Sequence, residues 1–526
     1  MKAVDQFDQD GVAASVQFAP DERGRENVPP TRYLFRLLLM IALIPSIYQW
    51  LVHVVIAFTP GTNGIYDLSV YYAAALALRD NAHANIYNPD VLRAAASAHG
   101  AFLMPVATLY LYPPLLAILT IPLTLMSLTS AAHVWVVCNL LMWLAATALL
   151  ASLFRSILAP QIDSTSSASL NRGQPAAGRL RAGMAAVISW AEHVPDVTVF
   201  AFAVTFALSL SNASLEESVV IGQVSLLIFF LLVLAVWLER RGQSEMAGAV
   251  LAFAALIKVF PLVLIGYYVL RGNWRLVRGA AICAIVLLIG MTLYVGVPGV
   301  LATRAIFSNA ASSATQYQNE SLARLPFWLG ILAGRELHHV ALYSGYLLIV
   351  AVLIAFMAGV AFLTLSSRRR SGMQANRAMV AHRVPDDALG YAWALATMVL
   401  VSPVTWEHHL AWLLPACLFS MGYTLRLLSG EWRQDPGRFK VGLMVLGLLI
   451  IGYVFVSNDL PFGYDGLVPL SPGPYIIHDI PIRPFFMIER PIGGLLIWLA
   501  SGILYLRAYL PGVRGARYQG VESPTN

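Results

Sequence analysis

The stretch AAHVWVVCNLLMWLAATALLASLF, residues 131–154, contains no Asp, Glu, Lys or Arg. A helix needs about 20 consecutive apolar residues to cross a bilayer, and this run is long enough. Comparable runs recur at about 33–58, 102–127, 190–212, 220–238, 246–270, 278–297, 343–366, 388–404, 408–428, 441–457 and 491–510. We therefore predict an all-α, polytopic membrane protein with a bundle of about twelve transmembrane helices.

The composition of the whole chain agrees with this prediction. Of its 526 residues, 58% are hydrophobic and only 12% are charged, a balance that excludes a soluble domain. The first apolar run follows a polar tail and has no small-residue cleavage site behind it, so we expect a permanent span and not a signal peptide. The net charge of +6 comes from Arg residues beside apolar runs, a pattern typical of cytoplasmic loops and not of nucleic-acid binding.

Twelve crossings place both termini on one side of the membrane. Basic loops at 367–387 and 429–440 mark that side as the cytoplasm. We expect a disordered cytoplasmic tail at 1–31, one transmembrane domain at 32–511 and a second cytoplasmic tail at 512–526. The same parity predicts three long external stretches, at residues 59–101, 298–342 and 458–490.

The middle of the chain leaves the number of crossings open between eleven and thirteen. Loop 155–183 and the run Glu239–Arg241 are basic, yet parity places them outside. Either 190–212 or 246–270 could be two half-helices that return to one face, because Pro195 and Pro261 interrupt them.

The first external stretch contains an acid at the start of an Ala-rich segment. Asp67 precedes Leu68-Ser69-Val70-Tyr71-Tyr72 and a run of alanines, which predicts a short surface helix that begins near Asp67. An Asp at this place is often only an N-cap, and the spacing alone does not separate that role from a catalytic one.

A second notable charge lies inside an apolar run. Lys258 is flanked by Ala254-Ala255-Leu256-Ile257 and Val259-Phe260-Pro261. A lone ammonium inside a membrane costs roughly 2.5–3.5 kcal/mol, so we expect it to be retained for an anionic partner such as a phosphate. Snorkelling to the interface is the alternative.

A pair of histidines comes after Trp406-Glu407 at the entry of a later span. Adjacent residues on a helix point about 100° apart, so His408 and His409 are a poor chelating pair. No metal-ligand cluster stands out in the sequence, so we predict no obligatory metal and no cofactor, and leave open whether a divalent ion assists.

Six motifs in this order resemble glycosyltransferase family 87. They are DLSVYYAAALAL from Asp67, YPPL from Tyr112, GQVS from Gly222, AALIKVFP around Lys258, NES from Asn319 and SPVTWEHH from Ser402. The family commonly has NQS where this chain has Asn319-Glu320-Ser321. The resemblance implies a GT-C-like fold and an enzyme that uses polyprenyl-phosphate sugars.

The resemblance also implies roles for individual residues. Asp67 matches the family's catalytic base, and His408 with His409 match its functional histidine motif. A polyprenyl phosphate leaves without protonation, so one base can suffice for an inverting transfer. The departing phosphate needs cations, for which Lys258 and Arg324 are the candidates. The remaining candidates form the substrate pocket, and they are Tyr71, Tyr112, Gln223, Asn319 and Glu407.

The expected partners are a polyprenyl-phosphate hexose donor, mannose above all, a lipid or glycan acceptor, and membrane lipids. The active site should face outward, on the periplasmic side of the cell membrane. The alternatives are a transporter or flippase for lipid-linked glycans, and a ligase or non-catalytic assembly factor. A catalytic Asp67 that lies near the two histidines would distinguish the transferase from them.

Overall fold

The computed structural model describes residues 46–59, 66–101, 109–158, 197–306, 319–332, 338–374, 388–429, 435–457 and 483–509, together with Ile44 and Leu103. All regular structure within these residues is helical, in agreement with the predicted fold class. The predicted tails at 1–31 and 512–526 lie outside the described residues, as does most of loop 155–183.

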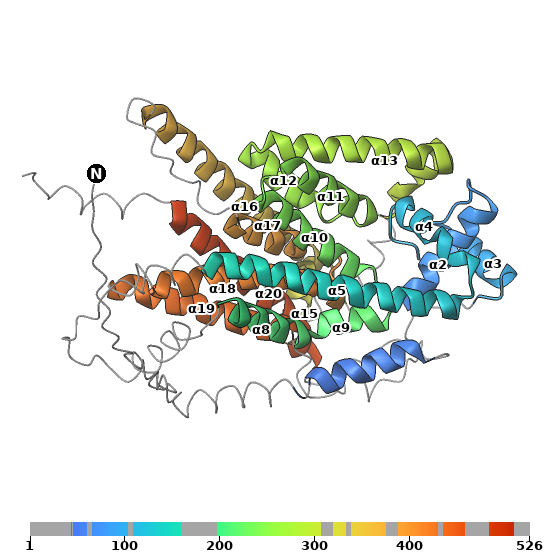
Figure 1. Cartoon of the computed structure of the whole chain (residues 1–526), viewed down its shortest axis with the longest axis horizontal. Coiled ribbons are helices and arrows are strands. Elements are labelled where there is room, and N and C mark those ends of the chain that lie inside the picture. The colour runs from blue at the N-terminus through green and yellow to red at the C-terminus, as the bar shows by residue number, and fades with distance from the viewer. Residues whose placement is uncertain are drawn as a thin grey trace, which may run out of the picture.

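The helices form one elongated bundle (Figure 1). Their bounds are Ser46–Phe58 for the first, then α2 Tyr66–Asp80, α3 Pro89–Ala98, α4 Pro114–Thr120, α5 Leu128–Leu158, α8 Val197–Leu210, α9 Ala213–Val220, α10 Ser225–Arg240, α11 Ser244–Ile257, α12 Leu262–Arg271, α13 Trp274–Leu301, α15 Leu325–Leu332, α16 His338–Gln374, α17 Ala388–Leu400, α18 Leu413–Ser429, α19 Pro436–Ser457 and α20 Arg483–Tyr509. Short 3₁₀ helices are η1 Ile121–Leu125, η3 Ala302–Arg304, η4 Leu322–Arg324 and η5 Glu407–Trp412.

Six helical segments within the described residues are long and apolar enough to cross a membrane, or seven if α8 and α9 count as one bent span. The predicted count of twelve is therefore not confirmed. Shorter apolar helices, α11, α12 and α17 among them, complete the bundle. Of these, α17 is buried along its whole length.

The segment predicted to cross at 102–127 has a different form where it is described. It contains the seven-residue α4 and the five-residue η1, and both pack on α2. Pro113, Pro114 and Pro122 explain the short elements, because proline lacks the amide that a continuous helix requires. The long α5 starts beside η1 and runs away from α2, so Arg155 lies toward the opposite end of the bundle (Figure 1).

Helices α11 and α12 form a hairpin, so the chain comes back to the end of the bundle at which α11 begins. The backbone between them is extended at Lys258, with φ −146° and ψ 123°. Both open ends of the hairpin meet the start of α13, where Gly248 and Gly279 let α11 and α13 pack backbone to backbone. The structure thus has one of the two expected half-helix arrangements, that of 246–270, and Lys258 lies at the tip of the hairpin.

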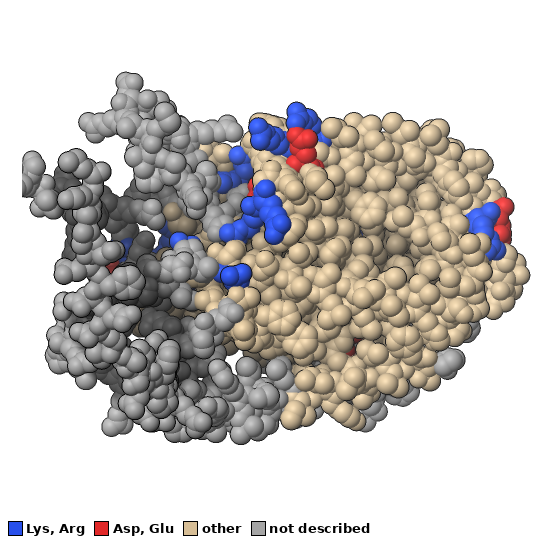
Figure 2. All heavy atoms as spheres, viewed as in Figure 1, with Lys and Arg blue, Asp and Glu red and all other residues tan. Residues whose placement is uncertain are grey.

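The two ends of the bundle differ in charge. We call the end that contains α2, α3, α4 and η1 the α2 end. The opposite end, the basic end, contains Arg155, Arg240, Arg241, Arg271, Arg275 and Arg278. Figure 2 shows Lys and Arg side chains gathered toward this end, while most of the same face is uncharged.

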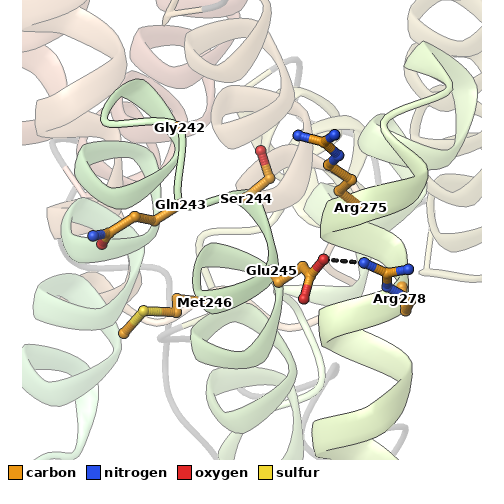
Figure 3. Close-up of a pocket in the computed structure, with 7 residues that line it drawn as sticks. All are labelled: Gly242, Gln243, Ser244, Glu245, Met246, Arg275 and Arg278. Carbon is orange, nitrogen blue, oxygen red and sulfur yellow. Dashed lines mark hydrogen bonds and ion pairs between the residues drawn. The ribbon is translucent and has the colours of Figure 1, made fainter.

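The basic end also contains a hollow of about 350 Å³ between α11 and α13. Figure 3 shows its lining, in which Arg278 of α13 forms an ion pair with Glu245 of α11. None of the predicted site residues lines this hollow.

Candidate active site

The turn between α9 and α10 packs directly on the start of α2. Gly222 in this turn has φ +68°, and a Cβ there would lie only 2.9 Å from the Cβ of Leu68. The amide of Asp67 donates to the carbonyl of Ile221 at 3.1 Å. Only glycine meets both the backbone and the space requirement at 222, so this contact sets the position of Asp67.

The carboxylate of Asp67 is held by Gln223. The amide Nε2 of Gln223 donates to Asp67 Oδ2, while its Oε1 lies 2.5 Å from the hydroxyl of Tyr71 and 2.9 Å from that of Tyr112. Because the tyrosine hydroxyls and the amide of Val224 use Oε1, the side-chain amide can only present Nε2 to Asp67. Asp67 lies in the first turn of α2, and its carboxylate bonds outside its own helix.

Asp67 is partly exposed, whereas Tyr71, Gln223 and Tyr112 are buried. Burial raises the pKa of Asp67 from 3.8 to about 6, and the ammonium of Lys258 opposes the rise. At pH 7 this carboxyl is therefore mostly ionised and yet a stronger base than an ordinary aspartate.

Lys258 lies between two aromatic rings inside the bundle. Its Nζ is 5.4 Å from the centre of the Tyr112 ring and 5.2 Å from that of Trp412, within range of cation–π attraction. The residue is only 7% exposed, and its ammonium has no hydrogen-bond partner among the described residues. A buried ammonium with unused donors is a favourable place for an anion.

The ring of Trp412 connects the two histidines to Lys258. The ring of His409 stacks on that of Trp412 at 4.8 Å, and Trp412 in turn faces Lys258. The amide of Trp406 donates to His409 Nδ1 at 3.2 Å, so the proton of a neutral His409 is on Nε2. The two histidine rings are nearly perpendicular, and His408 Nδ1 lies 3.9 Å from Glu217 Oε2.

We call this group the Lys258 cluster. Its members are Asp67, Tyr71, Tyr112, Glu217, Gln223, Lys258, His408, His409 and Trp412. It brings together residues from α2, α9, the α11–α12 tip and η5, and it includes seven of the ten predicted site residues.

The other three predicted residues lie on or beside a second buried group. Arg490 of α20 forms ion pairs with Glu320 and Glu407, and Asn319 is hydrogen-bonded to the segment that precedes Glu407. We call Asn319, Glu320, Glu407 and Arg490 the Arg490 cluster.

Arg324 comes after this cluster in η4. Its guanidinium lies 4.1 Å from the centre of the Phe327 ring, and burial lowers its pKa. Its predicted contact with a donor phosphate alongside Lys258 stays a prediction.

Sequence reasoning missed Glu217, Trp412 and Arg490. The sequence did mark Glu217 and Arg490, because Glu216-Glu217 and Glu489-Arg490 are charged pairs at the edges of apolar segments. Charges at such places are costly and point to function or to pairing. Trp412 gave no signal, because an aromatic residue in an apolar helix is common. Among the described residues, no three His, Cys, Asp or Glu side chains converge as metal ligands would.

The sequence model of glycosyltransferase family 87 matches residues 110–403, more than half of the chain. Tyr112, Gln223, Lys258, Asn319 and Arg324 fall inside the matched range, whereas Asp67 and the two histidines fall outside it. Neither a curated protein nor a solved structure matches the chain.

Proposed function

The chain belongs to glycosyltransferase family 87, and on this premise we propose that it moves a hexose, with mannose favoured, from a polyprenyl-phosphate donor to a lipid or glycan acceptor. The family makes the protein a membrane glycosyltransferase. The single observation that carries the finer proposal is the meeting of Asp67, a partly exposed base, with the buried cation Lys258 around Gln223 and Tyr112.

Asp67 acts as the general base in this proposal. Its carboxylate takes the proton of the acceptor hydroxyl as that oxygen attacks C1 of the sugar. The bond between C1 and the phosphate oxygen breaks on the opposite side, so the configuration at C1 inverts. A pKa of about 6 suits the task, because the group is ionised at pH 7 and binds a proton more strongly than an unperturbed aspartate.

Lys258 receives the departing phosphate. This phosphate gains a negative charge as the bond to C1 breaks, and an ammonium already buried beside it needs no reorganisation. The ammonium of Lys258 has no hydrogen-bond partner in the described part of the chain, which supports this role. Gln223, Tyr71 and Tyr112 position Asp67 and Lys258, and their place in the substrate pocket stays a prediction.

His408 and His409 contribute neutral hydrogen-bond donors to the sugar or the phosphate. His408 has no hydrogen bond on either ring nitrogen among the described residues, so it is the better candidate for a substrate contact. His409 is stacked on Trp412 and bonded to the backbone, which favours a supporting role.

We place the reaction on the external face of the cell membrane. The arginines of the basic end match the distribution of cytoplasmic loops, and Asp67 lies in α2 at the opposite end. Arg155 at the end of α5 and the run Glu239–Arg241 at the end of α10 both belong to the basic end, which supports this orientation.

The test is a transfer assay with the purified protein. Polyprenyl-phosphate mannose, glucose and arabinose would be offered in turn with an extract of membrane lipids as acceptor, and mass spectrometry would detect the product. We expect transfer from at least one of these donors and none from the corresponding nucleotide sugars. Transfer from nucleotide sugars alone would refute the proposal.

A further inference from the structure

Arg490 bridges two carboxylates that come from distant parts of the chain. One guanidinium nitrogen donates to Glu320 Oε1 and the other to Glu407 Oε1, the second bond at 2.9 Å. The side chains of Arg490 and Glu320 are 10% and 5% exposed, so this contact lies in the protein interior. Arg490 belongs to α20, a helix in the apolar set that can cross the membrane.

The backbone brings the two carboxylates together. The amide of Glu320 donates to the carbonyl of Thr405 at 2.7 Å, and Asn319 Oδ1 accepts from the amide of Thr405 at 3.0 Å. Asn319 also donates from Nδ2 to the carbonyl of Pro403. Segment 319–321 is thereby fixed along segment 403–405, and two acids meet beside one guanidinium. Without that cation, two like charges would share a poorly hydrated site.

Glu407 leads directly into the histidine pair. It is the first residue of η5, and His408 and His409 come next. A 3₁₀ helix of six residues has poor hydrogen-bond geometry and little stability of its own, so its direction depends on the contacts that hold its ends. At its far end, Trp412 donates to the carbonyl of Ser225 at 3.1 Å. At its near end, Glu407 accepts from Arg490, and Thr405 just before it is bonded to Asn319 and Glu320.

We propose that Arg490 is a positioning residue: by bridging Glu320 and Glu407 it fixes the start of η5 and thereby aims His408 and His409 at the site of transfer. The bridge also accounts for an acid at position 320, since Glu320 supplies the second carboxylate that orients the planar guanidinium. The effect on transfer rests on the proposed function, whereas the effect on the order of η5 does not.

The test compares Arg490→Lys, Arg490→Gln and the double variant Glu320→Gln/Arg490→Gln. Lysine keeps the charge but lacks the planar fork that holds two carboxylates at once. Arg490→Gln alone leaves the Glu320 carboxylate buried without its cation. Glu320→Gln removes that carboxylate, so the double variant can be measured even if Arg490→Gln does not fold. Arg507→Gln is the matched control, because Arg507 is an exposed residue near the other end of the same helix.

We expect Arg490→Lys and the double variant to lose about 2–10-fold in kcat, the size expected for a misplaced neutral hydrogen bond from the histidines. The KM for the donor should change little, because Lys258 is untouched. The double variant should have a Tm nearer to that of the wild type than Arg490→Gln does, and yet no higher kcat. A role in folding alone would restore Tm and kcat together.

Hydrogen exchange gives a readout independent of transfer. Peptides that cover 403–412 should exchange faster in Arg490→Lys and in the double variant, and at the wild-type rate in Arg507→Gln. Unchanged exchange in both variants, or wild-type kcat in either, would overturn the inference. Failure of the wild-type protein to use any polyprenyl-phosphate sugar would refute the proposed function instead, and the exchange result would still decide the role of Arg490.

Discussion

The Lys258 cluster and the Arg490 cluster are both buried and both centred on a cation, yet they are built in opposite ways. The charge of Arg490 is paired with two carboxylates from the same protein. Lys258 meets two aromatic rings and has no hydrogen-bond partner among the described residues. A guanidinium paired with carboxylates of its own protein organises the residues around it, whereas an ammonium without such a partner favours an anion from outside.

The difference also separates two kinds of acid. Glu407 is engaged by Arg490, which makes it a poor alternative to Asp67 as a base. Asp67 accepts from the neutral amide of Gln223 and keeps part of its surface exposed. Substitutions in the Lys258 cluster should therefore affect chemistry and binding first, and those in the Arg490 cluster should affect the order of η5.

The largest effect should come from Asp67→Asn. Asparagine is nearly isosteric and keeps a contact with Gln223, but it cannot take a proton from the acceptor hydroxyl. We expect transfer to fall by about 10²–10⁴-fold, the usual worth of a general base. A lipid-phosphate sugar assay with purified protein measures this loss.

Two controls accompany this variant. The raised pKa of Asp67 means that its ionised form is disfavoured in the folded protein, so Asp67→Asn should have a Tm at pH 7 no lower than the wild type. Asp80→Asn, at the other end of α2, should keep turnover within a few-fold, because Asp80 is an exposed residue whose ion pairs are with Arg79 and His99. Near-normal transfer by Asp67→Asn would remove the base from the mechanism.

Lys258→Met should give the next largest effect. Methionine suits a buried position between two rings, so the fold should survive. The lost hydrogen bonds to a charged phosphate are worth roughly 1.5–3 kcal/mol, which corresponds to about 10–100-fold weaker donor binding. Binding of polyprenyl phosphate and the KM for the donor both report it. Lys440→Met, an exposed residue near the start of α19, is the matched control. Wild-type donor affinity in Lys258→Met would contradict the comparison.

Much of this organisation could be predicted from the sequence, and the exceptions have a common cause. Long apolar runs predict helices and the six motifs predict the family, because both signals are local. Seven predicted residues meet in the Lys258 cluster, although they come from five separate motifs. The sequence allowed a pair of half-helices at either 190–212 or 246–270 and did not decide between them, because half-helices and full spans have the same apolar composition.

The contacts of the Arg490 cluster could not be predicted from the sequence. Glu320 and Arg490 are 170 residues apart, and nothing local at either position names the other as its partner. The pairing results from the tertiary position of α20 beside segment 319–321. The same holds for Glu217 and His408, which meet because α8 and α9 are bent by 59° at Asn212.

The pH dependence of kcat/KM in the wild type should give a third, smaller effect. This effect comes from Asp67, a member of the Lys258 cluster. Asp67 has a pKa of about 6, so it is ionised above this pH and protonated below it. Only the ionised form can accept a proton, and kcat/KM should therefore fall about tenfold per pH unit below about pH 6. Rates measured between pH 5 and 8, with Tm recorded at each pH, test this. A flat profile between pH 7 and 5 would show that Asp67 does not titrate during turnover.

The smallest effect should come from the two histidines, and it should differ in kind between them. His408 has both ring nitrogens free of hydrogen bonds among the described residues, whereas His409 is tied to Trp406 and stacked on Trp412. A neutral hydrogen bond to substrate is worth about 0.5–1.5 kcal/mol, so His408→Asn should lower kcat/KM by only about 2–10-fold, with Tm nearly unchanged. His409→Asn should lower Tm more than His408→Asn does, because it removes a ring packed in the core of the site. If His409→Asn instead kept its Tm while His408→Asn unfolded, the division into a substrate-facing and a supporting histidine would be wrong. Because the two residues are adjacent and the substitutions identical, the difference between the variants can only come from where η5 directs each ring.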